Sequence, residues 1–161
     1  MSWLIRNQAD DFFNAYKVLK QNNEPIVSPR VVCLAFSLEL YFKVLYYTHN
    51  LIPPRSHSIL KLFMSLPRQI RRGIFFHETI SGNPFVTRGP ILYRKRFSGV
   101  ASDYFGFIKH LEAISNGFAK WRYAHESQSL KYEEWFALAL IESVKSASDA
   151  TGARSIGQQQ D

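Results

Sequence analysis

One stretch of the chain, residues 31–47, is almost uninterruptedly apolar and has the sequence VVCLAFSLELYFKVLYY. Only Ser37, Glu39 and Lys43 break the pattern. A helix with this pattern is hydrophobic around most of its circumference and must be covered on several sides. We therefore predict that residues 31–47 form the central helix of the fold.

Both ends of this helix carry sequence signals. Ser28 is predicted to cap the free amides at the start, and Pro29 suits the first turn, where a missing N–H costs nothing. Asn50, followed by Pro53 and Pro54, predicts the end, because proline cannot continue a helix.

A transmembrane span is the competing interpretation of the same stretch. The run is shorter than the roughly 20 residues that a bilayer core requires, and it carries Glu39 and Lys43 near its middle. We therefore expect no membrane association. Because the acid precedes the base by four residues, the two side chains are expected to meet on one face of the helix.

Four further segments have apolar residues at helical spacing and are predicted to cover the central helix. They are residues 7–21, Ser58 to Leu66, a helix capped by Ser102 or Asp103 that continues to Trp121, and about Lys131 to Ala147. Pro67 either kinks the second of these or opens another helix through Thr79. In that region Ile70, Ile74 and Phe75 are expected to point inward.

Composition limits the class of protein. A chain of 161 residues with 46% hydrophobic content is expected to form one domain over residues 1–150, followed by a disordered tail at 151–161. The single cysteine, Cys33, excludes a disulfide framework and is expected to be a buried thiol in a reducing location. Residues 1–11 lack the pattern of a signal peptide, which predicts a cytoplasmic protein.

The net charge of +7 is concentrated in one part of the chain. Between Arg68 and Arg96 there is one acid, Glu78. The basic residues in that interval are Arg68, Arg71, Arg72, Arg88, Arg94, Lys95 and Arg96. A clustered positive field attracts polyanions, nucleic acid first. A merely solvated basic surface is the alternative.

Residues 81–101 contain three glycines and two prolines without a helical period, which predicts one long basic loop or a short hairpin. Its aromatic residues Phe85, Tyr93 and Phe97 alternate with cations. Aromatic faces for base stacking beside cations for phosphate suit single-stranded nucleic acid. The alternative is that the aromatic side chains anchor the loop on the core.

Three pieces together resemble the HEPN domain family. They are the apolar helix CLAFSLELYFKVLYY, the turn and short helix SHSILKLFMSLP, and the late segment FAKWRYAHE, in the order that the family has them. The resemblance implies an all-α, antiparallel bundle of four to five helices that usually dimerises. Many members are metal-independent ribonucleases, often toxins or phage-defence effectors. Others bind nucleic acid or nucleotides, or are partners of nucleotidyltransferases.

In the active ribonucleases of the family, a late helix carries an Arg and, four to six residues on, a His. Here only Tyr123 and Ala124 separate Arg122 from His125, so the spacing departs from that pattern. On a helix Arg122 would still share a face with His125 and Glu126. The resemblance makes Arg122, His125 and Glu126 the candidate catalytic residues, because His can deprotonate a ribose hydroxyl and Arg can stabilise charge on the phosphate.

A literal match to the family spacing occurs in RGIFFH, where four residues separate Arg72 from His77. It lies before the place where the family keeps its motif, and Ile74, Phe75 and Phe76 look like core residues. We therefore interpret Arg72 as part of a basic surface.

The remaining histidines do not suggest a metal site. His57 precedes a helix and is expected to cap or pack, and His49 and His110 have no partner at metal-ligand spacing. A Gly-rich phosphate loop and a Ser nucleophile motif are also missing from the sequence. We expect no metal and no cofactor.

Three functions remain open. The first is an RNA-binding, HEPN-like homodimer of a toxin-antitoxin or phage-defence module, with a nucleotidyltransferase-type or other antitoxin as a possible partner. The second is a metal-independent ribonuclease that uses Arg122 and His125. The third is a helical protein-interaction module, which internal ion pairs of the arginines between Arg68 and Arg96 would support. The 15% aromatic content favours self-association, and a strictly monomeric sedimentation profile at micromolar protein would contradict it.

Overall fold

The computed structural model describes residues 2–21, 27–81, 100–115, 117, 121 and 132–156. Within these ranges the regular structure is entirely helical, which confirms the all-α class. The helices are α1 (Ser2–Gln21), α2 (Val27–Thr48), α3 (Ile59–Met64), α4 (Arg68–Phe75), α5 (Glu78–Ser81), α8 (Val100–Ile114) and α10 (Glu134–Ile156).

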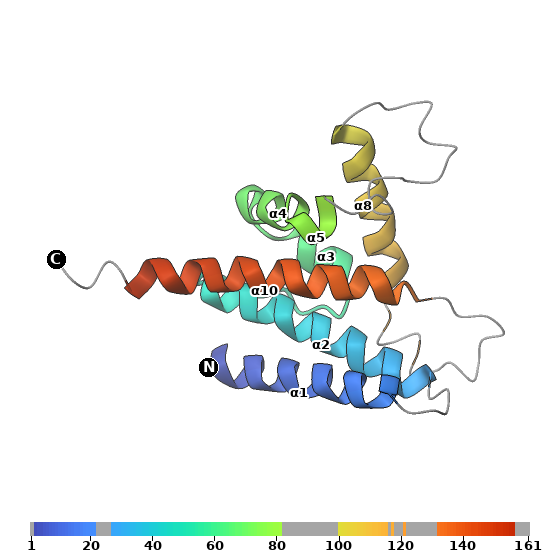
Figure 1. Ribbon diagram of the computed structural model, residues 1–161. Helices are drawn as coiled ribbons and strands as arrows, with labels where there is room; N and C mark the ends of the chain where they lie inside the picture. Colours follow the sequence, from blue (N-terminus) through green and yellow to red (C-terminus); the bar gives the residue numbers. More distant parts are fainter. Residues whose placement is uncertain are drawn as a thin grey trace.

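The central position of α2 is the main feature of the fold (Figure 1). α1 and α2 run antiparallel and pack along each other, and α10 lies along α2. α10 also contacts α4 and α5, whereas α3 packs against both α2 and α8. Helices therefore cover α2 on several sides, as its apolar circumference requires.

Burial along α2 confirms the predicted core helix. Leu34, Leu38, Phe42 and Leu45 are completely buried. By length and composition the segment Pro29–Thr48 could also cross a membrane, but 67% of it is buried among the other helices. Such burial is what a core helix shows. Cys33 is only partly buried, and this burial raises the pKa of its thiol.

The two ends of α2 differ in how well the sequence predicted them. α2 already begins at Val27, so Ser28 and Pro29 belong to its first turn, and Ser28 does not precede the helix as a cap. At the other end Asn50 has a left-handed φ of 54°. The amide of Asn50 donates to the carbonyl of Tyr47, and that of Leu51 donates to Tyr46. This is the Schellman pattern of helix ends, which a left-handed Asn can close.

Pro67 opens a new helix, which decides between the two interpretations of this residue. α3 ends at Met64, and Pro67 is the N-terminal cap residue of α4. The start of α3 is as predicted, because the Ser58 hydroxyl accepts a hydrogen bond from the amide of Lys61.

The last two long helices differ from their predicted bounds. α8 starts at Val100, so Ser102 and Asp103 lie within its first turn. α10 starts at Glu134 and extends beyond the expected end of the domain, to Ile156.

A polar cluster around Glu134 ties α10 to α1 and α2. The Tyr16 hydroxyl donates to Glu134 Oε1 over 2.5 Å, and Lys20 Nζ lies 2.8 Å from the same oxygen. Arg30 of α2 lies 3.2 Å from Oε2. Burial raises the pKa of Glu134, but the hydrogen bonds from Lys20 and Tyr16 and the charges of Lys20 and Arg30 outweigh it, so the pKa is lowered overall.

Candidate nucleic-acid interface

α4 presents the basic residues that the structure describes. Ile74 and Phe75 are buried, whereas Arg68 and Arg72 are exposed and Arg71 is partly buried. The helix is short and starts directly after Pro67, so its register is set by the proline and by the two buried apolar residues. The predicted inward positions of Ile74 and Phe75 are confirmed, whereas Ile70 is only partly buried.

The arginines of α4 are not neutralised within the described part of the chain. None of Arg68, Arg71 and Arg72 lies within 4.0 Å of a carboxylate oxygen of a described residue. Arg71 instead points at the sulfur of Met64 over 3.7 Å, and its Nε is buried without a described partner. For these three residues, no ion pair with a described residue supports a protein-interaction module.

An exposed aromatic side chain lies beside this charge. Phe76 is 50% exposed, and the guanidinium of Arg72 lies 5.9 Å from its ring centre. The expectation that Phe76 is a core residue is therefore wrong. α4 ends at Phe75, and Phe76 is the cap residue, so its ring stacks edgewise on Phe75 at 4.9 Å and remains open to solvent.

The literal Arg and His match in RGIFFH is not a pair in the structure. Arg72 contacts Phe76, whereas Nδ1 of His77 lies 2.8 Å from the hydroxyl of Thr79. Thr79 in turn donates to the carbonyl of Ala139, 3.0 Å away. His77 thus helps to start α5 and dock it on α10.

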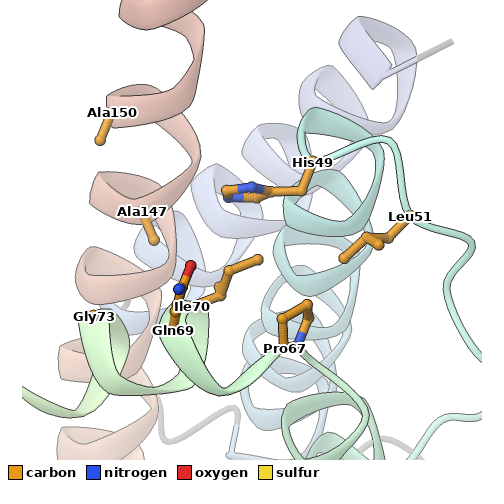
Figure 2. Close-up of a pocket in the computed structure, with 8 residues that line it drawn as sticks. All are labelled: His49, Leu51, Pro67, Gln69, Ile70, Gly73, Ala147 and Ala150. Atoms are coloured by element: carbon orange, nitrogen blue, oxygen red, sulfur yellow. The ribbon is translucent and has the colours of Figure 1, made fainter.

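Next to the arginines lies an open pocket of about 560 Å³ (Figure 2). It is bounded by α4, by α10 and by the end of α2. Its lining residues are His49, Leu51, Pro67, Gln69, Ile70, Gly73, Ala147 and Ala150. Most of the lining is apolar, and the side chains of His49 and Gln69 are its only polar ones among the described residues. Sequence reasoning missed this pocket because its walls are separate in the chain.

A buried carboxylate forms a second polar site on α2. The side chain of Glu39 is 1% exposed, and its Oε1 lies 2.6 Å from Lys43 Nζ, as the four-residue spacing predicted. Nδ1 of His57 lies 3.0 Å from each carboxylate oxygen. Because a carboxylate only accepts hydrogen bonds, His57 Nδ1 is the donor in this contact. His57 therefore has a definite partner, which sequence reasoning did not find.

The other predicted site residues lie outside the described residues. These are the candidate catalytic residues Arg122, His125 and Glu126 and the cations Arg88, Arg94, Lys95 and Arg96. The aromatic residues Phe85, Tyr93 and Phe97 also lie there. The site that can be built from contacts is therefore α4 with the adjacent pocket. Among the described residues, no three His, Cys, Asp or Glu side chains are grouped so as to hold a metal ion.

The fold and site define an all-α protein with a basic helix. Comparisons of the chain with protein-family models, with curated proteins and with solved structures find no match.

Proposed function

We propose that this protein binds RNA through α4 and the basic residues that follow it along the chain. The observation that carries the proposal is the state of Arg68, Arg71 and Arg72, which meet no carboxylate among the described residues. Guanidinium groups without a carboxylate partner in this part of the chain can bind phosphates. The exposed ring of Phe76 beside Arg72 adds a face for base stacking.

The same proposal includes the wider role that the family resemblance implies. We propose a HEPN-like homodimer of a toxin-antitoxin or phage-defence module, with an antitoxin partner such as a nucleotidyltransferase. Exposed apolar side chains on α1 support self-association, since Trp3 is 66% and Val18 is 62% exposed. RNA cleavage in EDTA that requires Arg122 and His125 would instead make the protein a ribonuclease.

A charge-matched pair of variants tests the proposal. Arg68→Ala/Arg72→Ala removes two exposed cations from α4, and Lys17→Ala/Arg55→Ala removes two exposed cations elsewhere, so both variants lose the same net charge. Binding of a labelled single-stranded RNA is measured by fluorescence anisotropy over a series of salt concentrations. Circular dichroism verifies that each variant is folded.

We expect the α4 variant to bind more weakly and to depend less on salt. The slope of log affinity against log salt should fall by about 0.7 for each phosphate that the protein no longer neutralises. The control variant should keep most of the affinity and the slope. Equal losses in both variants, or no RNA binding by the native protein, would contradict the proposal.

A further inference from the structure

The described residues around Gly73, which lines the pocket, do not explain why this position is a glycine. It lies within α4, where a glycine costs about 0.5–1 kcal/mol relative to alanine. Its backbone φ is not left-handed, and a Cβ built there would meet no atom within 4 Å. Neither backbone conformation nor packing therefore requires glycine. A missing side chain at such a place allows a ligand to approach the helix closely.

The walls of the pocket suit an uncharged, flat group with a polar edge. Figure 2 shows Gln69 and Ile70 rising from α4 and the ring of His49 reaching in from the end of α2. Ala147 of α10 forms the opposite wall. The described lining includes no Asp, Glu, Lys or Arg side chain, which disfavours a charged ligand in the pocket itself. An amide can pair with the edge of a heterocycle, and an imidazole ring and apolar walls can cover its faces.

The cations of α4 favour a heterocycle that is attached to phosphate. Arg68 and Arg72 are four residues apart and share one face of α4, and the lining residues Gln69 and Gly73, each one position later, share the neighbouring face. An RNA strand whose phosphates lie on the two arginines can direct a base toward the floor at Gly73. The volume of about 560 Å³ is within the usual range for small-ligand pockets.

We propose that the pocket between α4, α10 and the end of α2 receives one unpaired base of the bound RNA. This inference rests on the proposed RNA binding. It adds a base-binding site beside α4, so that an RNA with an unpaired base binds better than a fully paired RNA. Gln69 faces the polar edge of the base, and the ring of His49 with Ile70, Leu51 and Ala147 covers its apolar surface. Gly73 leaves the space that the base occupies.

Two hairpin RNAs of identical charge serve as probes. One carries a single bulged base in its stem, and the other carries an abasic residue at the same position, so that only the base is missing. The measured quantity is the ratio of the two dissociation constants. For the native protein we expect the bulged hairpin to bind roughly tenfold more tightly, the order of magnitude of one stacked base.

Variants that fill the pocket should abolish this ratio and leave the abasic affinity unchanged. Gly73→Leu fills it from α4, at a position where an added Cβ meets no atom within 4 Å, and Ala147→Leu fills it from α10 in case the first variant is unstable. Gln8→Leu is the control, since it adds the same side chain at an exposed position of α1 outside the pocket. It should keep the native ratio.

The outcomes separate this inference from the proposed function. A native ratio near one, or a ratio unchanged by both filling variants, overturns the base pocket even if Arg68→Ala/Arg72→Ala still weakens binding. Equal losses for both hairpins on filling the pocket overturn it too, because they indicate a general disturbance of α4. If Arg68→Ala/Arg72→Ala weakens both hairpins equally and the ratio persists, the phosphate contacts and the base contact are separate, as proposed.

Discussion

At the scale of single residues, Glu39 shows that a buried acid in an apolar helix requires hydrogen-bond donors. A carboxylate that is 1% exposed needs hydrogen-bond donors, because burying an unpaired charge is costly. The sequence predicted one donor, Lys43, from its spacing. It could not predict His57, which is 18 residues away and is brought to Glu39 only by the turn before α3.

Glu39→Gln is expected to destabilise the protein by about 1–3 kcal/mol, because a neutral amide offers a single acceptor to two donors. The matched control is Glu112→Gln, which removes a carboxylate 2.7 Å from Lys109 whose side chain is 43% exposed. Exposed pairs contribute little, so the control should change the stability by less than about 1 kcal/mol. Urea unfolding measures both. A smaller loss for Glu39→Gln than for the control would contradict this account.

At the scale of helices, close packing can be read from a second glycine. A Cβ on Gly117 would lie 2.4 Å from Cε2 of Tyr132 and 3.2 Å from the Cβ of Ala35 on α2. The hydroxyl of Tyr132 is buried without a described hydrogen-bond partner, and this burial raises its pKa. The ring is therefore held by packing, and Gly117 makes the room for it.

Gly117→Ala should destabilise the fold by about 1–3 kcal/mol, because the Tyr132 ring must move. Gly73→Ala should be neutral or should stabilise by up to about 1 kcal/mol, since it gains helix propensity without a clash. Thermal unfolding of both variants under one condition compares them. Similar shifts of both melting temperatures would be the contradictory result.

The helices themselves were largely predictable, and their ends less so. The apolar run of α2 and the stripe of Ile59, Leu62 and Phe63 on α3 depend only on spacing, which the sequence displays. Helix starts were less predictable. Serine can cap a helix or lie in its first turn, so Ser28 and Ser102 gave starts later than those found. The side chain of Phe76 was misplaced because α4 ends one residue before it.

At the scale of the whole molecule, Glu134 connects the three long helices α1, α2 and α10. Its folded-state pKa lies below the ordinary value of 4.5. A carboxyl group with a lowered pKa stabilises the fold above its unfolded-state pKa and loses this contribution as the pH falls through the folded-state value. The contribution of Glu134 is therefore present at neutral pH and is lost in acid.

Glu134→Gln should lower the free energy of unfolding at pH 7 and flatten its dependence on pH between about 5 and about 3. Glu142→Gln, on an exposed position of the same helix, is the control and should keep the native slope. Urea unfolding at a series of pH values gives both curves. An unchanged acid slope in Glu134→Gln would show that the cluster does not act in this way.

The candidate site was only partly predictable at this scale. The clustered charge of Arg68, Arg71 and Arg72 followed from the sequence, because it depends on one short segment of the chain. The pocket did not, because His49, Gln69 and Ala147 come from three segments whose packing the pattern does not encode.

Pro67 has a consequence for how fast the protein could bind. It is at once a wall of the pocket and the residue from which α4, with its arginines, begins. The pocket wall at Pro67 and the arginines of α4 therefore form one unit. This unit is already ordered in the folded protein before RNA binds. Binding to such a surface loses little conformational entropy, and opposite charges speed the encounter. Differences in affinity between RNA ligands should then reside in how long each complex lasts.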